Sequence, residues 1–378
     1  MAASTPHTLN GDSFLQLVVE GTRYIECYVD DINALNVFPV PDGDTGTNLL
    51  LTMRAALGSS DLPTPGTRTV AQVSAALSHG ALLGARGNSG VIFSQFMKGI
   101  AHALAEVSEC EGSDLVRALK AASTAGYQAV SSPVEGTMLT VMRAAADGTT
   151  SMTGSAVDVL SKALGSASSA LAYTPEQLPI LKEAGVVDSG GQGVVAFLAG
   201  ALAFASGEDI PLEISSPVGR KGTFNVNQQF LEHTEEEMYG FCTQFIIFGE
   251  GLNIETIRAQ VQSLAGSVVV IGDDRTIRIH GHAEDPGPLL TLGVELGSID
   301  QVSIQNMDLQ HQEFMALHGY TQDEDIQLAV IPVTMGVGLS RIFKDLGAPT
   351  VVNGGQTMNP SAVQLLEAVR KVNAAHTI

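Results

Sequence analysis

One short stretch, Asp42-Gly-Asp-Thr-Gly46, constrains the fold most, because it is too tightly turned to be helix or strand. Its two glycines admit the positive φ that such a turn needs. An apolar, helix-like run from Leu49 to Leu57 follows at once. Both aspartates can therefore face one point ahead of a helix N-terminus, where free N–H groups favour phosphate. Carboxylates suit Mg²⁺ held together with substrate phosphates, so the stretch predicts a Mg-nucleotide site. Taken alone, an Asx-turn that caps a helix is the commoner explanation.

Residues 13 to 206 carry the pattern of a helical domain. Apolar side chains recur every three or four residues, and alanine, a strong helix former, is abundant. Polar and glycine-rich residues gather at four joints, 42–48, 84–90, 132–137 and 185–193. We therefore expect a helical bundle whose interhelix loops carry the chemistry. The predicted helical runs are 13–35, 48–58, 69–83, 91–107, 113–131, 137–146, 154–171 and 191–206.

The second joint, Gly84-Ala-Arg-Gly-Asn-Ser-Gly90, has the composition of a phosphate-binding loop. Its backbone amides and the Ser89 hydroxyl suit phosphate oxygens. Two further joints, Pro133-Val-Glu-Gly-Thr-Met-Leu139 and Gly185-Val-Val-Asp-Ser-Gly-Gly-Gln-Gly193, are similar in kind. Each alone could be a helix cap or a tight corner. Four such loops in one helical domain, two of them with aspartates, indicate a nucleotide site.

The pattern changes after residue 206. Residues 207–222 bear proline and glycine and predict a linker. The runs that follow predict the order β-α-β-β-α-β, which is that of a ferredoxin-like unit. We therefore expect an α+β middle domain. Its predicted segments are strand 241–248, helix 254–264, strands 267–271 and 276–280, helix 288–296 and strand 301–305.

From about residue 308 we expect a connector and then the start of an α/β domain. Ile326-Gln-Leu-Ala-Val-Ile-Pro-Val333 predicts a buried parallel strand. A Gly-Val-Gly turn, a helix to Leu346, a short strand from Thr350 and a final helix opened by Asn353-Gly-Gly-Gln-Thr-Met-Asn-Pro360 follow. Two parallel strands cannot make a covered sheet, so we expect this piece to dock on something or to continue.

The bulk composition narrows the partners. The chain has 378 residues, which is enough for two or three domains. Its net charge of −21 speaks against nucleic acid and anionic membranes and means that ATP needs cations brought to it. Three scattered cysteines, Cys27, Cys110 and Cys242, predict reduced thiols in a cytoplasmic protein. The N-terminus lacks a signal-peptide core, and the longest near-apolar run, 193–205, is too short for a transmembrane segment.

A second group of candidate ligands lies in the middle domain. His280 and His282 are two apart on a predicted strand, so both side chains face the same side. Cys242 lies on another strand that the predicted topology can bring alongside. Cysteine with two histidines suits Zn²⁺, with water or Glu284 as a fourth ligand. Paired histidines on a half-exposed strand are also ordinary. Because the ATP loops are in another domain, we expect a structural or interdomain role for such a zinc rather than a catalytic one.

Taken together, these motifs resemble the fatty acid kinase family, whose nucleotide domain is of the dihydroxyacetone-kinase L-subunit (DhaL, Dak2) type. The resemblance covers essentially the whole chain, including Tyr239-Gly-Phe-Cys-Thr-Gln-Phe245 and Ile279-His-Gly-His-Ala-Glu-Asp-Pro-Gly287. It implies an eight-helix barrel that holds ATP and two Mg²⁺. The expected division is a kinase domain at 1–206, a linker at 207–222, a middle domain at 223–307 and a C-terminal domain, cut off here, at 308–378.

The resemblance also assigns residues. Asp42 and Asp44 match the metal-binding acids, and Asn36 stands where the dihydroxyacetone-kinase branch has a further acidic ligand. Arg86 could neutralise the transferring phosphate or be an ordinary surface arginine. With Asp42 and Asp44 as Mg²⁺ ligands and Arg86 beside them, the expected nucleotide-binding positions are Asn36, Thr45, Asn48, Gly87, Asn88, Ser89, Gly90, Thr137, Met138, Asp188 and Gly190.

The acceptor is the remaining question. A hydroxyl acceptor usually needs a general base, and the four loops hold no obvious histidine, since His79 is expected on a helix surface. A carboxylate, with an ordinary pKa of about 4.3, is ionised at neutral pH and needs no base. This favours an acyl-phosphate product. The resemblance implies that a separate fatty-acid-binding protein (FakB-like) presents the fatty acid to a homodimeric kinase. The alternatives are a dihydroxyacetone-type kinase acting on a small hydroxyketone and a nucleotide-bound regulatory or scaffold protein without turnover.

Overall fold

The computed structural model describes residues 8–212 and 240–317, then 326–334, 350–353, 374–378 and a few residues between them. Two compact units divide the chain, Met1–Phe314 and Met315–Ile378. Several sequence predictions lie wholly or partly outside the described residues. They are the linker beyond residue 212, the middle-domain segment 223–239 with Tyr239, the Gly-Val-Gly turn at 336–338 with part of the helix to Leu346, and the segment 354–359 with the start of the final helix. The domain boundaries predicted from the sequence stay a prediction.

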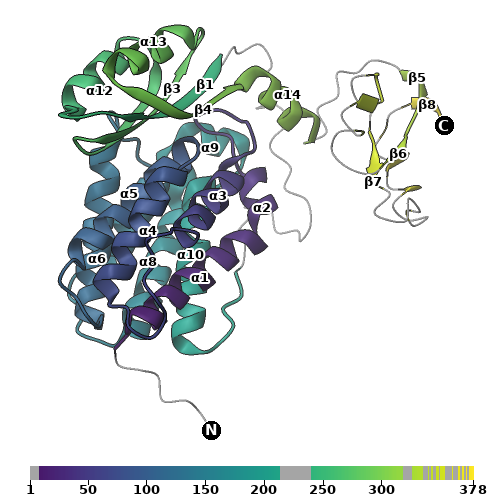
Figure 1. Cartoon of the computed structure of the whole chain (residues 1–378). Helices are drawn as coiled ribbons and strands as arrows, with labels where there is room; N and C mark the ends of the chain where they lie inside the picture. Colours follow the sequence, from purple (N-terminus) through teal and green to yellow (C-terminus); the bar gives the residue numbers. More distant parts are fainter. Residues whose placement is uncertain are drawn as a thin grey trace. The chain divides into compact units, whose positions relative to one another are not determined.

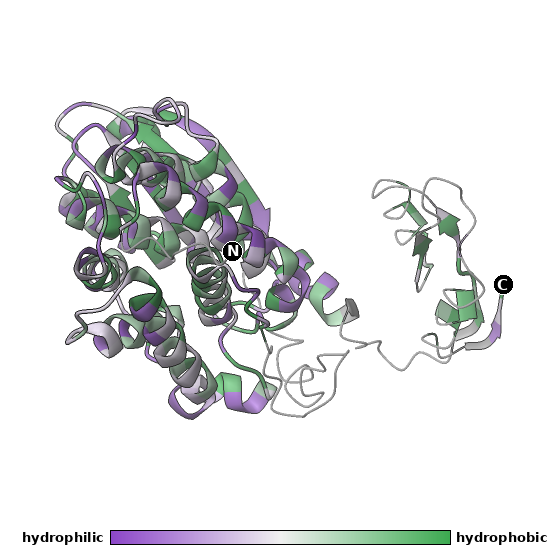
Figure 2. Cartoon of the chain, turned by 90° about the horizontal axis from the view of Figure 1, so that it is seen from below, coloured by the Kyte–Doolittle hydropathy of each residue, from purple (hydrophilic) through white to green (hydrophobic). Residues whose placement is uncertain are grey.

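Ten helices occupy residues 11–206 within the described chain (Figure 1). Eight of them have 12 to 22 residues, and the two short ones, α2 and α9, have six. All predicted helical runs fall on these helices, although 13–35 is two helices that break at Tyr28. Apolar and polar residues both appear along the helix ribbons (Figure 2), as expected of helices that turn one side to a core. The helices are α1 Gly11–Cys27, α2 Val29–Ala34, α3 Thr45–Leu57, α4 Val70–Gly84, α5 Gly87–Ala103, α6 Gly112–Ala129, α7 Met138–Thr149, α8 Ala156–Gln177, α9 Pro179–Ala184 and α10 Ser189–Ser206.

Helix α10 is the centre of this bundle and packs against α1, α3, α7 and α8. Two glycines let it approach α1 closely. A Cβ on Gly200 would lie 2.3 Å from the Glu20 carbonyl oxygen, and one on Gly21 would lie 2.6 Å from the Phe197 ring. By length and composition α10 is the one described helix that could cross a membrane, but 72% of it is buried within the chain. Its apolar character is therefore that of a core helix.

A four-stranded antiparallel sheet with two helices follows in the predicted β-α-β-β-α-β order. The strands lie in the order β2-β3-β1-β4. Val268 and Val270 point to the core under α12 and α13, together with Phe245. Alternate residues point to the other face, because successive side chains of a strand do. The elements are β1 Phe241–Phe248, α12 Ile254–Gln262, β2 Gly266–Gly272, β3 Thr276–Ala283, α13 Gly287–Leu296 and β4 Ser298–Asn306.

The second face of the sheet lies on one end of the helical bundle (Figure 1). Val269 and Ile271 form a small core with Ala85, Val91 and Ala129 of the bundle. Val269 also makes a β-bridge with Val130, at the end of α6. The Lys98 ammonium donates to the Gly272 carbonyl oxygen at 3.1 Å. The sheet is therefore covered on both faces at β1, β2 and β3, while Val302 and Ile304 of the edge strand β4 Ser298–Asn306 are exposed. This docking places the sheet beside the interhelix loops.

The expectation of a connector from residue 308 is wrong. Helix α14, Met307–Leu317, occupies it and begins where the Asn306 carboxamide oxygen accepts the N–H groups of Asp308 and Leu309. His311 on this helix is buried, and its Nδ1 lies 3.1 Å from the Pro41 carbonyl oxygen. The sequence pattern missed the helix because its apolar residues pack around the Asp-Gly-Asp loop, with Met307 on Val40 and Phe314 beside Gly43, and form no regular stripe.

The second unit differs from the expectation of one buried strand and one short strand. The predicted strand is two pieces, β5 Ile326–Ala329 and β6 Val333–Thr334, separated around Pro332. Each pairs in parallel with a different partner, β5 with β8 Ala374–Thr377 and β6 with β7 Val352–Asn353. Proline has no N–H to donate, which favours such a break. Leu328 is 55% exposed, so the expectation of burial holds for Ala329 but not for Leu328.

Candidate functional site

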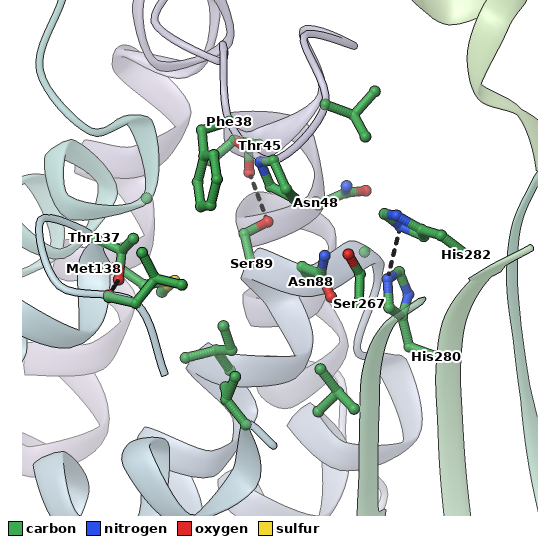
Figure 3. Close-up of a pocket in the computed structure, with 18 of the residues that line it drawn as sticks. Phe38, Thr45, Asn48, Asn88, Ser89, Thr137, Met138, Ser267, His280 and His282 are labelled. Atoms are coloured by element: carbon green, nitrogen blue, oxygen red, sulfur yellow. Dashed lines mark hydrogen bonds between the residues drawn. The ribbon is translucent and has the colours of Figure 1, made fainter. Parts of the chain in front are cut away.

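A cavity of about 440 Å³ lies between the interhelix loops and the sheet. Figure 3 shows Asn48, Asn88 and Ser89 on the helical side and His280 and His282 on the sheet side of this hollow. Two candidates, Arg86 and Gly90, do not line it. The predicted site residues that line it are Asn36, Asp42, Asp44, Thr45, Asn48, Gly87, Asn88, Ser89, Thr137, Met138, Asp188, Gly190, Cys242, His280 and His282.

Four helix N-termini open on this cavity, those of α3, α5, α7 and α10. Three of the residues at their N-caps, Asp44, Arg86 and Thr137, make no capping hydrogen bond with their side chains. Other side chains already accept some of the first N–H groups. In α3, Asn36 and Asn33 accept the N–H groups of Thr45 and Thr47. In α5, Gln244 accepts that of Gly87, and in α7, Asp188 accepts that of Met138. The N–H groups that remain and the positive dipole ends together favour an anion. The simple capping explanation for Asp44 therefore fails.

The Asp-Gly-Asp loop is braced by Asn36, which is buried. The Asn36 Nδ2 donates to the Val40 carbonyl oxygen at 2.7 Å. Its Oδ1 accepts the Thr45 N–H at 3.0 Å and also the Thr45 hydroxyl. The Thr45 carbonyl oxygen in turn accepts the Ser89 hydroxyl at 3.5 Å (Figure 3). The Asn36 oxygen is thus already used by two donors, so this geometry makes Asn36 a brace of the loop and not a metal ligand.

Asp42 and Asp44 lie together in the cavity. Burial raises the pKa of Asp42 well above its usual range, and the neighbouring Asp44 raises it further. Burial also raises the pKa of Asp44, against a hydrogen bond from Asn48 that lowers it. Two close carboxyls that share a proton are costly to ionise together, and a divalent cation removes that cost. The pair is therefore suited to hold Mg²⁺.

The glycine-rich joint begins with residues outside the cavity and then enters it. Gly87 has φ of +58°, and a Cβ there would lie 2.3 Å from the Asn48 Nδ2. The exposed Arg86 donates its backbone N–H to the Thr52 hydroxyl at 3.2 Å. Gly90 is a packing glycine, since a Cβ there would lie 2.2 Å from Thr52 Oγ1. Of this joint, Gly87, Asn88 and Ser89 face the cavity.

The third joint is held by a network around Glu135. The Glu135 carboxylate accepts both Arg143 Nη1 and Nη2, each at 2.7 Å. It also accepts the Thr140 hydroxyl at 2.6 Å and the Tyr127 hydroxyl at 3.1 Å. The Arg143 bonds, more than any other cause, lower the pKa of Glu135. This network fixes the turn that presents Thr137 to the cavity.

At the fourth joint Asp188 caps α10. It is 5% exposed and accepts the Gly191 N–H at 2.6 Å. Burial raises its pKa to about 7, although bonds from the Gly191 and Met138 N–H groups oppose the rise. Asp188 thereby joins the third and fourth joints. A carboxyl this deep stays partly protonated near neutral pH.

The Cys–His cluster lies on the sheet and lines the same cavity as the interhelix loops, so the two domains that the sequence separates meet there. Potential ligand atoms of Cys242, His280 and His282 all lie within 4.8 Å of one another. The two histidine Nε2 atoms are 3.2 Å apart. Burial raises the pKa of Cys242 to about 12, and Asp44 and Asp42 add to the rise. Burial lowers the pKa of His282 to about 4 and that of His280 well below its usual value.

The sequence pattern missed the middle-domain walls of the cavity. Gln262, Ala265, Ser267 and Val268 line it from α12, β2 and the turn between them. No local motif marks them, because they reach the cavity only through the docking of the sheet. Ser132 is the first residue of the third joint, 132–137, and Ser131, which directly precedes it, could have been included with it. His79 is exposed and pairs with Asp61 at 2.6 Å, as expected of a surface histidine. All three cysteines are free thiols.

Family models match three parts of the chain. A DAK2 domain matches residues 39–203. The middle domain and the C-terminal domain of FakA-like fatty acid kinase proteins match residues 238–314 and 329–378.

Known proteins match almost the whole chain. Protein YloV of Bacillus subtilis (strain 168) is 36% identical over 386 residues, which are 97% of this chain and 69% of YloV. An uncharacterized protein of Staphylococcus aureus (strain USA300) is 32% identical over 382 residues, 98% of this chain and 69% of that protein. The dihydroxyacetone kinase of C. freundii (native form) aligns with 53% of this chain and 36% of that chain, at 18% identity and a TM-score of 0.37. That structural likeness is too distant to bear on function.

Proposed function

Because the chain belongs to the FakA-like family of fatty acid kinase proteins, with a DAK2 domain in its N-terminal part, we propose that it is an ATP-dependent kinase subunit. The phosphoryl acceptor is the carboxylate of a fatty acid that a separate fatty-acid-binding protein (FakB-like) presents, and the product is an acyl phosphate. One observation carries the proposal. Four helix N-termini and the Asp42–Asp44 pair open on a single cavity.

Different residues of the cavity bind the metal and the phosphates. Mg²⁺, when bound with ATP, neutralises charge on the transferring group. Asp42 and Asp44 hold it, and two ions fit the family resemblance. The N–H groups in the first turns of α5 and α7, apart from those of Gly87 and Met138, bind phosphate oxygens together with the Ser89 hydroxyl. Arg86 stays a candidate only if its exposed side chain swings toward the phosphates. The partner's carboxylate needs no base, since it is ionised at neutral pH.

The Cys–His cluster fits Zn²⁺. Tetrahedral coordination at about 2.1 Å requires neighbouring nitrogens to be roughly 3.3 Å apart, and the histidine Nε2 atoms are separated by 3.2 Å. The lowered histidine pKa values keep both imidazoles neutral, which is the form that binds metal. A zinc at Cys242, His280 and His282 would supply a Lewis acid in the transfer cavity. The same cluster without metal is a neutral thiol and two neutral imidazoles.

ATP turnover tests the proposal. We expect ATP consumption that requires Mg²⁺ and rises on addition of a fatty-acid-binding protein loaded with fatty acid, with acyl phosphate detected as its hydroxamate. Asp42→Asn and Asp44→Asn are expected to abolish turnover. Asp158→Asn, the same change in an exposed capping box of α8, is the matched control and keeps it. Turnover with dihydroxyacetone instead supports the small-hydroxyketone alternative. Binding of the partner without any turnover supports the scaffold alternative.

Further features belong to this proposal. They are a cytoplasmic homodimer, an eight-helix barrel for the bundle and a ferredoxin-like fold for the sheet domain. The strand order β2-β3-β1-β4 with two helices on one face supports the last of these.

A further inference from the structure

The sheet face toward the bundle carries a row of polar side chains. In the β1–β3 register Cys242 lies opposite His282, Gln244 opposite His280, and Ile246 opposite Arg278. Gln244 is 4% exposed and Arg278 is 3% exposed. Cys242 and the two histidines line the cavity, whereas Gln244 and Arg278 do not. The buried polar side chains of Gln244 and Arg278 therefore do not contact a ligand in the cavity and need another explanation.

Both of them hold the glycine-rich joint. The Gln244 Oε1 accepts the Gly87 N–H at 3.3 Å. The Arg278 Nη1 donates to the Leu83 carbonyl oxygen at 2.8 Å, just before the joint, and to the Gln301 Oε1 at 3.4 Å. On its opposite side the joint contacts α3: Gly87 packs against Asn48, and the Arg86 N–H donates to the Thr52 hydroxyl. The segment from Leu83 to Gly87 is thus held between the bundle and the sheet.

Burying the Arg278 guanidinium costs free energy, which argues that it does more than attach the sheet to the bundle. Among the described residues no carboxylate forms an ion pair with it, and its Nε has no partner. Burial lowers its pKa to about 10, and the nearby Arg86 contributes. Apolar side chains join two surfaces without this cost. The neighbouring residues Val269 and Ile271 do so on the same face.

We propose that Gln244 and Arg278 are positioning residues for the glycine-rich joint 84–90, so that the grip of the bundle on ATP depends on docking of the sheet. The inference rests on the proposed nucleotide site. Gly87 needs its positive φ to place the next two residues, Asn88 and Ser89, in the cavity. The Gln244 bond fixes that peptide. Undocking of the sheet releases the joint and weakens phosphate binding.

The experiment combines amide hydrogen exchange of residues 84–90 with calorimetric titration of Mg-ATP, both on this chain. We expect Gln244→Ala to raise exchange of the joint and to weaken Mg-ATP binding, each about tenfold, which is typical of losing one buried hydrogen bond. Gln244→Glu keeps an acceptor for the Gly87 N–H and is expected to keep exchange protection. Lys98→Met removes another bond between bundle and sheet, far from the joint, and is expected to change neither quantity.

The outcomes separate this inference from the proposed function. If Gln244→Ala and Arg278→Met fold and leave both quantities at the parent's values, the inference is overturned. It is also overturned if Lys98→Met has the same effect, because the weaker binding then follows from weaker attachment of the sheet to the bundle in general. If Gln244→Ala does not fold, Arg278→Met alone decides, since methionine removes the Nη1 donor to the Leu83 carbonyl oxygen. If the parent binds no Mg-ATP, the proposed function fails, and hydrogen exchange alone still decides on the joint.

Discussion

Replacing Asp188 with asparagine gives a stability change whose sign and pH range the structure fixes. Burial raises the pKa of Asp188 to about 7 in the folded chain, against 3.8 for an ordinary aspartate. The folded state therefore holds the proton more tightly than the unfolded state. The contribution to stability is complete below pH 3.8 and is lost as the pH rises toward 7. At about 1.4 kcal/mol for each pH unit between those values, the loss at neutral pH is about 4 kcal/mol.

The asparagine that Asp188→Asn introduces carries no charge and can still accept the Gly191 N–H, which the aspartate accepts at 2.6 Å. The variant is therefore expected to match the parent near pH 4 and to exceed its stability increasingly up to neutral pH. Urea unfolding followed by helical circular dichroism at several pH values measures the difference. Asp158→Asn is the control of opposite sign, because hydrogen bonds from Ser155 lower the pKa of Asp158 and its stabilisation is lost on acidification. A difference between parent and Asp188→Asn that stays constant from pH 4 to 8 would refute the reasoning.

Three further predictions follow from the joints and the cluster. Gly87→Ala places a Cβ 2.3 Å from the Asn48 Nδ2 at a residue whose φ is +58°. We expect this variant to bind Mg-ATP about tenfold more weakly or worse, as measured by calorimetry. An unchanged affinity would contradict the geometry of the joint. Glu135→Gln loses the half-exposed pair with Arg143 and is expected to cost about 0.5–1 kcal/mol at pH 7 in thermal unfolding. Because the pKa of Glu135 is lowered, that cost is expected to shrink as the pH falls through the lowered pKa, and a cost that grows on acidification would contradict this sign. His282→Ala is expected to reduce the zinc content of the purified chain, measured by elemental analysis, and a parent without zinc would refute the zinc proposal.

Local pattern predicts most of the elements well because their signals are local. The strand Phe241–Phe248 is predicted with its observed bounds, since its buried residues are bordered by glycines on both sides. Helix α10 is predicted from residue 191, two residues after its observed start at Ser189, because the Asp188 side chain that caps it lies in a stretch assigned to a loop. Helix α14 is not predicted because contacts with a distant part of the chain stabilise it. Its buried His311 meets the Pro41 carbonyl oxygen, a contact that no spacing within the helix announces.

The sequence predicts the two parts of the candidate site, the aspartate loop and the Cys–His cluster, but not that they lie in one cavity. Asp42 and Cys242 each stand in a motif that suggests a metal, but their separation along the chain says nothing of their distance in space. What joins them is the docking of β2 on the bundle through Val269 and Ile271, whose apolar side chains also suit an ordinary buried strand. The sequence leaves a structural and an interdomain role open for the cluster, and this docking brings the cluster to the cavity that the interhelix loops also line. Since the cavity has one wall from each part, separating the sheet from the bundle is expected to divide the acids from the thiol and imidazoles, and neither part alone retains the whole site.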